Sequence, residues 1–305
     1  PAEFHDIEPA TLVGMIRKLG FTSVHEVGFG ADLVALEYQR LLAEDKDKRW
    51  IATTCPAVVA YVERYHPELV DSLSPVVSPM IAMARMLKRL HGEMLRIVFI
   101  GPCVAKKGEA LSQHVADEVD VALTFTELRR MLPQHGVTAD GITPSEFDPP
   151  LAGDGTLFAI SRGLLQAAGI EEDLMVGQVV CADGRTEFVE AVREFESGDM
   201  DARLLEVLAC NGCIMGPGVS SSAPLFSRRS RVSKYVRQRM RTFDRARWEA
   251  AIKQAEGLNL RRTYSPNDQR IAVPSKDELT SIMARLGKHR PEDELNCGAC
   301  GYDTC

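Results

Sequence analysis

The stretch EVLACNGCIMGPG, residues 206–218, places Cys210 and Cys213 three positions apart and then runs into glycine and proline. The apolar run before it, 204–210, is compatible with a strand or with the end of a helix. A C-x2-C pair alone fits a redox dithiol, half of a zinc site or part of a larger metal centre. The positions of the other cysteines therefore decide how this stretch is interpreted.

Two further strand-like runs also end at a cysteine. RWIATTC ends at Cys55, and RIVFIGPC ends at Cys103. Ligands of open parallel α/β sheets bind beyond the carboxyl ends of the strands, so we expect cysteines from the three segments to meet at one edge. Cys55 also precedes a predicted helix N-terminus, where the helix dipole stabilises a thiolate. Together with Cys213, these thiolates could hold a four-iron cluster or a tetrahedral zinc ion.

Simpler interpretations of the cysteines remain open. Free cysteine is commonly buried as a small apolar side chain, so Cys55 and Cys103 could be structural thiols. Their repeated placement at strand ends favours ligation. Zinc is the harder alternative, because four thiolates suit it equally well. Cys181, in VVCADG, fits none of the three runs, and we interpret it as structural.

The order of the predicted elements indicates an α/β protein with mainly parallel sheets. Thr124 and Glu127 should form a capping box, and Pro56 should be the first residue of a helix. Residues 96–100 read as a buried strand by composition. Helices are expected over 9–20, from residue 56 and over 126–132, and strands over 49–54, 96–100, 119–125 and, more weakly, 156–161 and 176–180.

Composition and charge narrow the class of protein. The 305 residues are 45% hydrophobic and 26% charged, with a net charge of −7, which is typical of a soluble globular protein without a global attraction to nucleic acid. We find no apolar run of the ~20 residues that a membrane helix needs and no signal peptide, so a cytoplasmic location is expected. The basic stretch 227–248 is interrupted by apolar residues at helical spacing, which favours a solvated amphipathic helix.

Three stretches resemble the cysteine signatures of the catalytic domain of iron-only (FeFe) hydrogenases. TTCPA (53–57) is similar to T-S-C-C-P, GPCVAKKGEA (101–110) to M-P-C-x-x-K-x-x-E, and EVLACNGCIMGPG to E-x-M-x-C-x-G-G-C. FGADLVALE, YHPELVDSLSPVVSPM, DVALTFTELRRML and FDPPLAGDGTLFAISRG follow in the family's order, so that the resemblance covers about residues 1–286. It implies two α/β lobes with mainly parallel sheets flanked by helices and an iron–sulfur cluster between the lobes.

The resemblance also implies roles for individual residues. Cys55, Cys103, Cys210 and Cys213 would hold a 4Fe-4S cluster, and Cys213 would also bridge to a diiron subsite that completes an H-cluster. Lys106 would hydrogen-bond a cyanide ligand of that subsite, a charge-assisted contact. The neighbouring Lys107 is interpreted as a solvated surface lysine.

Several positions depart from the family's pattern. Thr54 stands where hydrogenases carry a cysteine that passes protons to the diiron site, and a hydroxyl has far too high a pKa to replace a thiol as a relay. Glu37 keeps the first acidic position of the family's pair, whereas Tyr38 occupies the second. Gly101 and Leu208 replace methionines, and the third signature is one glycine short. Proton delivery is therefore expected to be impaired, with Thr54 and Lys106 as the positions closest to any chemistry.

The last residues resemble the beginning of a small 4Fe-4S domain. Cys297, Cys300 and Cys305 follow a C-x2-C-x4-C pattern over 287–305, and the fourth ligand would lie beyond residue 305. This end, and the absence of an initiator methionine, suggest an excerpt of a longer protein. The domain order resembles the sensory branch of the family.

The expected function is hydrogen or redox sensing within a larger signalling protein. A slow hydrogenase and a cluster-holding protein without turnover remain alternatives. The expected ligands are H2 or protons, and the expected partners are an electron-transfer protein or a downstream signalling domain, or a second copy of the chain. Neither nucleic acid nor a membrane is expected.

Overall fold

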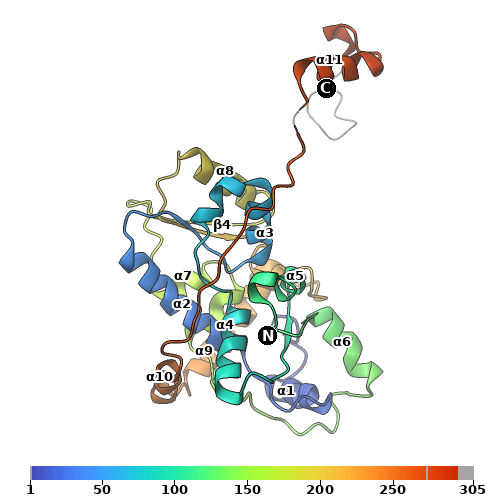
Figure 1. The fold of residues 1–305 in the computed structure, drawn as a ribbon. Helices are drawn as coiled ribbons and strands as arrows, with labels where there is room; N and C mark the ends of the chain where they lie inside the picture. Colours follow the sequence, from blue (N-terminus) through green and yellow to red (C-terminus); the bar gives the residue numbers. More distant parts are fainter. Residues whose placement is uncertain (1, 273, 295–305) are drawn as a thin grey trace. The chain divides into compact units, whose positions relative to one another are not determined.

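The fold is described by a computed structural model for residues 2–272 and 274–294. The chain divides into two compact units, residues 1–268 and 269–305 (Figure 1). The expected domain boundary after residue 286 stays a prediction. The predicted cluster ligands Cys297, Cys300 and Cys305 lie outside the described residues.

Two parallel sheets form the framework of the first unit. The larger has the strand order β1-β5-β4, with every pairing parallel, and the smaller pairs β2 with β3, also in parallel. The predicted α/β class with mainly parallel sheets is therefore confirmed. The strands are β1 (Trp50–Ile51), β2 (Val98–Gly101), β3 (Val121–Thr124), β4 (Val179–Asp183) and β5 (Leu204–Leu208).

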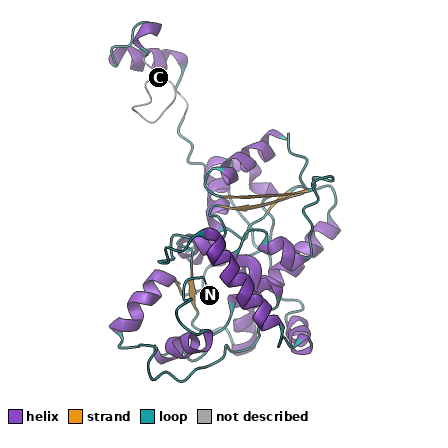
Figure 2. Ribbon diagram, turned by 180° about the vertical axis from the view of Figure 1, so that it is seen from behind, coloured by secondary structure: helices purple, strands orange, loops and turns teal. Residues whose placement is uncertain are grey.

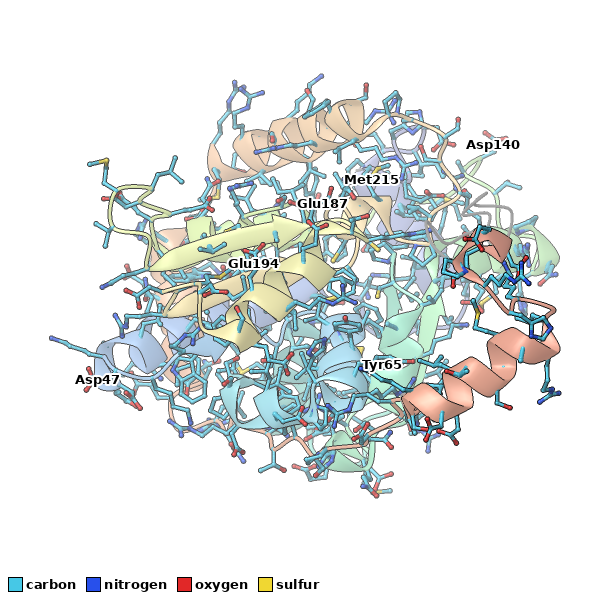
Figure 3. The ribbon with its side chains drawn as sticks, turned by 90° about the horizontal axis from the view of Figure 1, so that it is seen from above. Asp47, Tyr65, Asp140, Glu187, Glu194 and Met215 are labelled. Atoms are coloured by element: carbon cyan, nitrogen blue, oxygen red, sulfur yellow. The ribbon has the colours of Figure 1, made fainter. Side chains whose placement is uncertain are left out.

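Helices cover both faces of the larger sheet, as Figure 2 shows. Successive side chains of a strand point to opposite faces: Leu204 packs in the core with α2, whereas Leu205 and Val207 pack in a second core with α3 and α8. In Figure 3, Glu194 lies on α8 and Tyr65 at the end of α3. Burial on both faces explains why β5 is apolar along nearly its whole length. The helices are α2 (Val27–Glu44), α3 (Pro56–Tyr65), α7 (Gly163–Ala168) and α8 (Glu187–Ser197).

The first unit has two parts. One contains the larger sheet, and the other contains the smaller sheet together with α1, α5 and α6 (Figure 1). The predicted capping box of Thr124 and Glu127 is present and begins α6, and the predicted start of α3 at Pro56 is also found. Helix α4 packs along α2 and joins the two parts through one apolar core. The helices are α1 (Pro9–Lys18), α4 (Pro79–His91), α5 (Ala105–Ala110) and α6 (Phe125–Gln134).

Two expectations from the sequence were wrong. Residues 156–161 are not a strand: Asp154–Ala159 form a short 3₁₀ helix, because the chain there wraps the Asp32 carboxylate, which accepts the amides of Gly153 (2.7 Å) and Gly155 (2.6 Å). Strand β2 is half-buried rather than buried, since it belongs to a sheet of only two strands. The basic stretch is helical, as expected, but it is divided between α9 (Leu225–Met240) and α10 (Arg245–Gln254).

The remaining elements lead out of the first unit. Residues 258–268, which we call the strap, follow α10 and end where the second unit begins. The second unit contains α11 (Lys276–Arg285), which begins with a capping box at Ser275. Among the described helices, none combines the length and the apolar character needed to cross a membrane.

Candidate metal centre

Three of the predicted ligands follow the carboxyl ends of parallel strands. Cys55 comes after β1 and Cys210 after β5, which is the neighbour of β1 in the larger sheet. Cys103 comes after β2 of the smaller sheet. Cys213 begins the short 3₁₀ helix Cys213–Met215. The ligands of one centre would thus be drawn from both sheets.

The structure brings these four thiols within range of one another's charge. Burial raises the pKa of Cys213 to about 12, and the charges of Cys55, Cys103 and Cys210 contribute in the same direction. Burial likewise raises the pKa values of Cys103 and Cys210, and the charge of Cys55 adds to both. Crowded thiols of this kind stay protonated unless positive charge is brought between them.

Cys103 has hydrogen-bond donors and a cation in its surroundings. Its sulfur accepts the backbone amides of Ala105 and Lys106 at the beginning of α5, and the charge of Lys106 also lowers its pKa. Amide hydrogen bonds to sulfur are a usual feature of iron–sulfur sites. These contacts partly offset burial, which still leaves the pKa of Cys103 above its ordinary value.

The glycines after Cys213 allow its loop to approach the Cys103 loop closely. The amide of Gly218 donates to the carbonyl oxygen of Pro102 at 2.8 Å. A Cβ atom at Gly216 or Gly218 would lie 2.5 or 2.7 Å from that oxygen, closer than a real side chain permits. The interpretation of MGPG as tight backbone beside the cysteines, rather than as a phosphate loop, agrees with this geometry.

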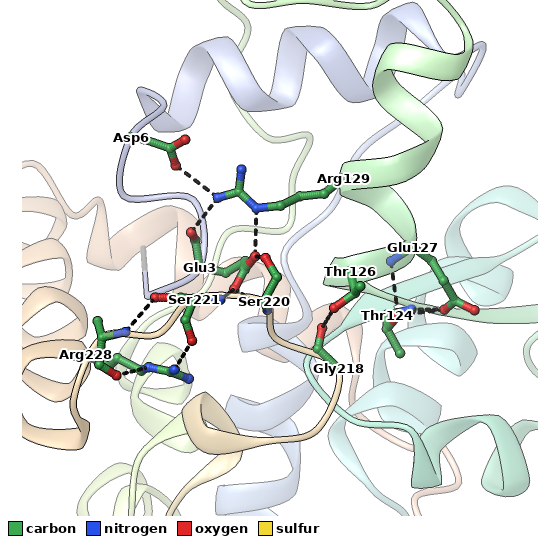
Figure 4. Close-up of polar contacts among 11 residues, drawn as sticks. Glu3, Asp6, Thr124, Thr126, Glu127, Arg129, Gly218, Ser220, Ser221 and Arg228 are labelled. Carbon is green, nitrogen blue, oxygen red and sulfur yellow. Dashed lines mark hydrogen bonds and ion pairs between the residues drawn. The ribbon is translucent and has the colours of Figure 1, made fainter.

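The chain beyond this loop is held by charged side chains (Figure 4). The Glu3 carboxylate accepts the amides of Ser220 and Ser221 at 3.0 and 3.1 Å and pairs with Arg129 at 2.7 Å. Arg228, itself buried, donates to the carbonyl oxygen of Ile214 at 2.7 Å. The backbone that follows Cys213 is thus fixed from outside the centre.

The donor set fits an iron–sulfur cluster. Four thiols and the cation Lys106 share the space, and two amides already face one sulfur. Within residues 2–272 and 274–294, however, no three His, Cys, Asp or Glu side chains are gathered closely enough to hold a metal ion. Ligation by Cys55, Cys103, Cys210 and Cys213 therefore stays a prediction.

Lys106 is buried and donates to a carboxylate. Its Nζ lies 2.6 Å from Glu109 Oε2, which also accepts Ser78 Oγ at 3.0 Å. The other oxygen of Glu109 accepts Arg262 at 3.1 Å. Lys106 thus has a fixed position beside the cysteines, whereas its proposed contact with a cyanide ligand stays a prediction. Lys107 is half-exposed and pairs with Glu127.

Tyr38 belongs to a buried group of hydroxyls, which we call the hydroxyl cluster: Tyr38, Thr53, Ser74 and Tyr264. The Tyr38 oxygen accepts the Thr53 amide at 2.8 Å and lies 2.5 Å from Ser74 Oγ and 3.2 Å from Thr53 Oγ1. Thr53 Oγ1 and Tyr264 Oη both lie within donating distance of the Val76 carbonyl oxygen, at 2.8 and 3.0 Å. At the position that the resemblance assigns to an acid, the Tyr38 hydroxyl therefore makes buried hydrogen bonds to neutral groups.

The other two positions of the predicted proton route are not in this cluster. Thr54 is half-buried in the turn that leads to Cys55. Glu37 pairs with Arg40 at 3.5 Å and with Arg261 at 3.9 Å. At Gly101, the ring of Phe99 takes the space of a longer side chain, since a Cβ atom there would lie 2.5 Å from it.

Cys181 contacts a carboxyl group rather than the other cysteines. Its thiol donates to Glu206 Oε2 at 3.3 Å, and the amide of Leu164 donates to the same carboxyl. Burial raises the pKa of Glu206 to about 7 and also raises the pKa of Cys181. This environment agrees with a structural, unreactive thiol.

Sequence reasoning missed Glu206, Arg262 and Tyr264. A glutamate inside the apolar run LLEVL was the available signal for Glu206, since a charged residue is rarely fully buried without a reason. Arg262 and Tyr264 stand in the polar stretch RRTYSPND, which has no periodicity and no cysteine. Only the folded structure places them beside residues 53, 76 and 109.

The family assignment follows from the comparison of this chain with known proteins. Residues 2–217 match the model of the family described as "Iron only hydrogenase large subunit, C-terminal domain". The chain belongs to this family. The structure of [FeFe]-hydrogenase HydA1 from Chlamydomonas reinhardtii, with 19% sequence identity, superposes with a TM-score of 0.68 over 85% of this chain and 88% of that one, which confirms the fold.

Two kinds of curated relative share this domain. Iron hydrogenase 1 of Clostridium pasteurianum is 26% identical over 171 residues, 50% of this chain and 30% of that protein. The "Cytosolic Fe-S cluster assembly factor narfl" of Danio rerio is 27% identical over 159 residues, 45% of this chain and 39% of that protein. The chain thus spans well under half the length of these relatives. An enzyme and an assembly factor both use the fold.

Proposed function

We propose that this chain is an iron–sulfur redox module that holds one 4Fe-4S cluster on Cys55, Cys103, Cys210 and Cys213 and turns hydrogen over slowly or not at all. Such a module suits the sensing of redox state or hydrogen within a larger signalling protein. Its immediate partner would be an electron donor or a downstream domain, with H2 or protons as the small ligand, in the cytoplasm. The cluster supplies one-electron storage when bound.

The hydroxyl cluster is the observation that carries this proposal. Proton transfer to a buried centre needs groups that gain and lose protons near neutral pH. Burial raises the pKa of Tyr38 still further above its ordinary value of 10.0, and its hydrogen bonds are made to hydroxyls and backbone rather than to an acid. Thr54 stands in the place of the proton-passing cysteine, and its hydroxyl likewise does not gain and lose protons near neutral pH.

The experiment is anaerobic purification followed by iron, sulfide and zinc analysis, infrared spectroscopy and a hydrogen-evolution assay. We expect about four irons per chain from the core site, reducible by one electron, with little hydrogen evolution. Carbon monoxide and cyanide bands would indicate a loaded diiron subsite and would separate a hydrogen sensor from a plain cluster holder. Fast evolution of hydrogen would overturn the proposal in favour of a hydrogenase.

A second candidate, a cluster-holding protein without redox signalling, is favoured by the likeness to the narfl assembly factor. An assembly role requires that the cluster leaves the protein. Incubation of the loaded protein with an acceptor that lacks its cluster distinguishes the two roles. Transfer within minutes would support assembly, whereas a cluster that stays bound through repeated reduction and oxidation would support the redox module.

A further inference from the structure

The strap, residues 258–268, adds a buried cation to the surroundings of the cysteines. It runs antiparallel to the chain around Val76: the Val77 amide donates to the Leu260 carbonyl at 2.9 Å, and the Arg262 amide to the Pro75 carbonyl at 3.2 Å. The strap lies outside residues 2–217, which match the family model. What it contributes therefore lies outside the region matched by the family model.

Two strap side chains point into the protein. The Arg262 side chain is only 6% exposed and donates to Glu109 at 3.1 Å. Its guanidinium carbon lies 4.6 Å from the centre of the Tyr264 ring, and Tyr264 Oη is 3.0 Å from the Val76 carbonyl oxygen. Arg262 Nε is buried and has no hydrogen-bond partner among the described residues.

Arg262 changes the charge balance of this region. Lys106 and Glu109 alone would neutralise each other, but the Glu109 carboxylate faces two cations, Lys106 at 2.6 Å and Arg262 at 3.1 Å. The trio of Lys106, Glu109 and Arg262 therefore carries one net positive charge in a buried place. Such a charge is costly unless negative charge lies nearby. The cysteine sulfurs would supply it once they bind a cluster as thiolates, since the charge of Lys106 acts on both Cys103 and Cys213.

We propose that Arg262 is a positioning residue for the metal centre, which leaves the charge of Lys106 uncompensated and thereby raises the reduction potential of the bound cluster. This inference rests on the proposed function. Reduction by one electron from a low-potential donor adds one negative charge to the cluster, so nearby positive charge stabilises the reduced form. By thermodynamic linkage, reduction must in turn strengthen the seating of the strap by the same factor.

The test is a redox titration of the full, cluster-loaded chain with dithionite, followed by paramagnetic resonance. Arg262→Gln should shift the midpoint potential to more negative values, by about tenfold in the reduced-to-oxidised equilibrium, which is about 59 mV for one electron. Arg262→Lys should recover most of the shift, because it keeps the charge. Arg261→Gln is the matched control, because the neighbouring side chain of Arg261 is 58% exposed. The midpoint potential of this variant should equal that of the unmodified protein.

A second variant tests the sign of the effect and does not depend on the folding of Arg262→Gln. Glu109→Gln removes the shared carboxylate and leaves two cations, so the potential should become more positive. Hydrogen exchange of the strap amides should be slower in the reduced protein than in the oxidised protein. Loaded protein whose potential is unmoved by either substitution, or moves with the opposite sign, overturns this inference alone; an unmodified protein that binds no cluster overturns the proposed function instead.

Discussion

Two regions beside the cysteines differ in one respect, which is charge. The trio of Lys106, Glu109 and Arg262 is ionic and carries a net positive charge. The hydroxyl cluster around Tyr38 is neutral and makes its hydrogen bonds to hydroxyls and backbone. A fixed positive charge stabilises an anionic cluster without gaining or losing a proton. Proton transfer, in contrast, needs groups that titrate. Under the proposed function, the trio would hold positive charge beside a cluster, whereas the hydroxyl cluster offers neutral hydroxyls where a proton route needs groups that titrate.

The largest effect should follow from Cys103→Ala. Its sulfur accepts two backbone amides and shares its surroundings with three other thiols, so its removal should abolish the core cluster. Iron per chain and the visible charge-transfer absorption of anaerobically reconstituted protein measure this loss. Cys181→Ala is the control and should keep the cluster, because Cys181 contacts Glu206 instead. Unmodified protein that binds zinc and no iron would refute the assignment.

The next largest effect should follow from Thr54→Cys, which tests whether the lack of a titrating group limits proton transfer. A thiol with an ordinary pKa of about 8.5 can pass protons that a hydroxyl cannot, so hydrogen evolution should rise at least tenfold once a synthetic diiron subsite is installed. Infrared spectroscopy must first show equal loading of the subsite. Thr54→Ser keeps the hydroxyl and should give no gain. Tyr38→Glu should add to the rate only in the Thr54→Cys background, because the two positions lie in series.

Glu206 is a buried carboxyl group that accepts a hydrogen bond from the Cys181 thiol and another from a backbone amide. Burial raises its pKa from 4.5 to about 7, so the folded state binds the proton more tightly than the unfolded state. Its contribution to stability is fully present below pH about 4.5 and is lost as the pH rises toward 7. At about 1.4 kcal/mol per pKa unit, the loss is on the order of 3 kcal/mol.

Glu206→Gln should therefore flatten the pH dependence of stability. Thermal melts of the two proteins between pH 4.5 and 8 measure it, and the variant should gain relative to the unmodified protein as the pH rises. Asp32, whose pKa burial raises to about 6, is present in both proteins and cancels in the difference. Parallel pH profiles would mean that the pKa of Glu206 is the same in the folded and the unfolded protein.

The sequence predicted the backbone of the site better than its polar interior. Strand-end cysteines, the capping box of Thr124 and the start of α3 follow from local rules that a short window contains. Arg262 and Tyr264 depend on where the strap lies, which no local pattern encodes. The short helix at Asp154–Ala159 was mistaken for a strand because its apolar residues TLFAI fit either state, and the Asp32 carboxylate that fixes it is distant in sequence.

The smallest effect should follow from Tyr38→Phe, which probes whether the neutral cluster stabilises the fold. The ring would keep its packing, but the buried Thr53 amide would lose its 2.8 Å acceptor and Ser74 its nearest hydroxyl partner. An unsatisfied buried amide costs about 1–3 kcal/mol, so the free energy of unfolding in urea should fall by that amount. Tyr65→Phe is the matched control, because Tyr65 is 46% exposed and exposed substitutions usually change stability by less than about 0.5 kcal/mol. Equal losses in the two variants would show that the Tyr38 hydroxyl adds nothing to stability. A loss confined to Tyr38→Phe would mean that the tyrosine is bound into this fold, so that restoring an acid there must also overcome the hydrogen bonds that replaced it.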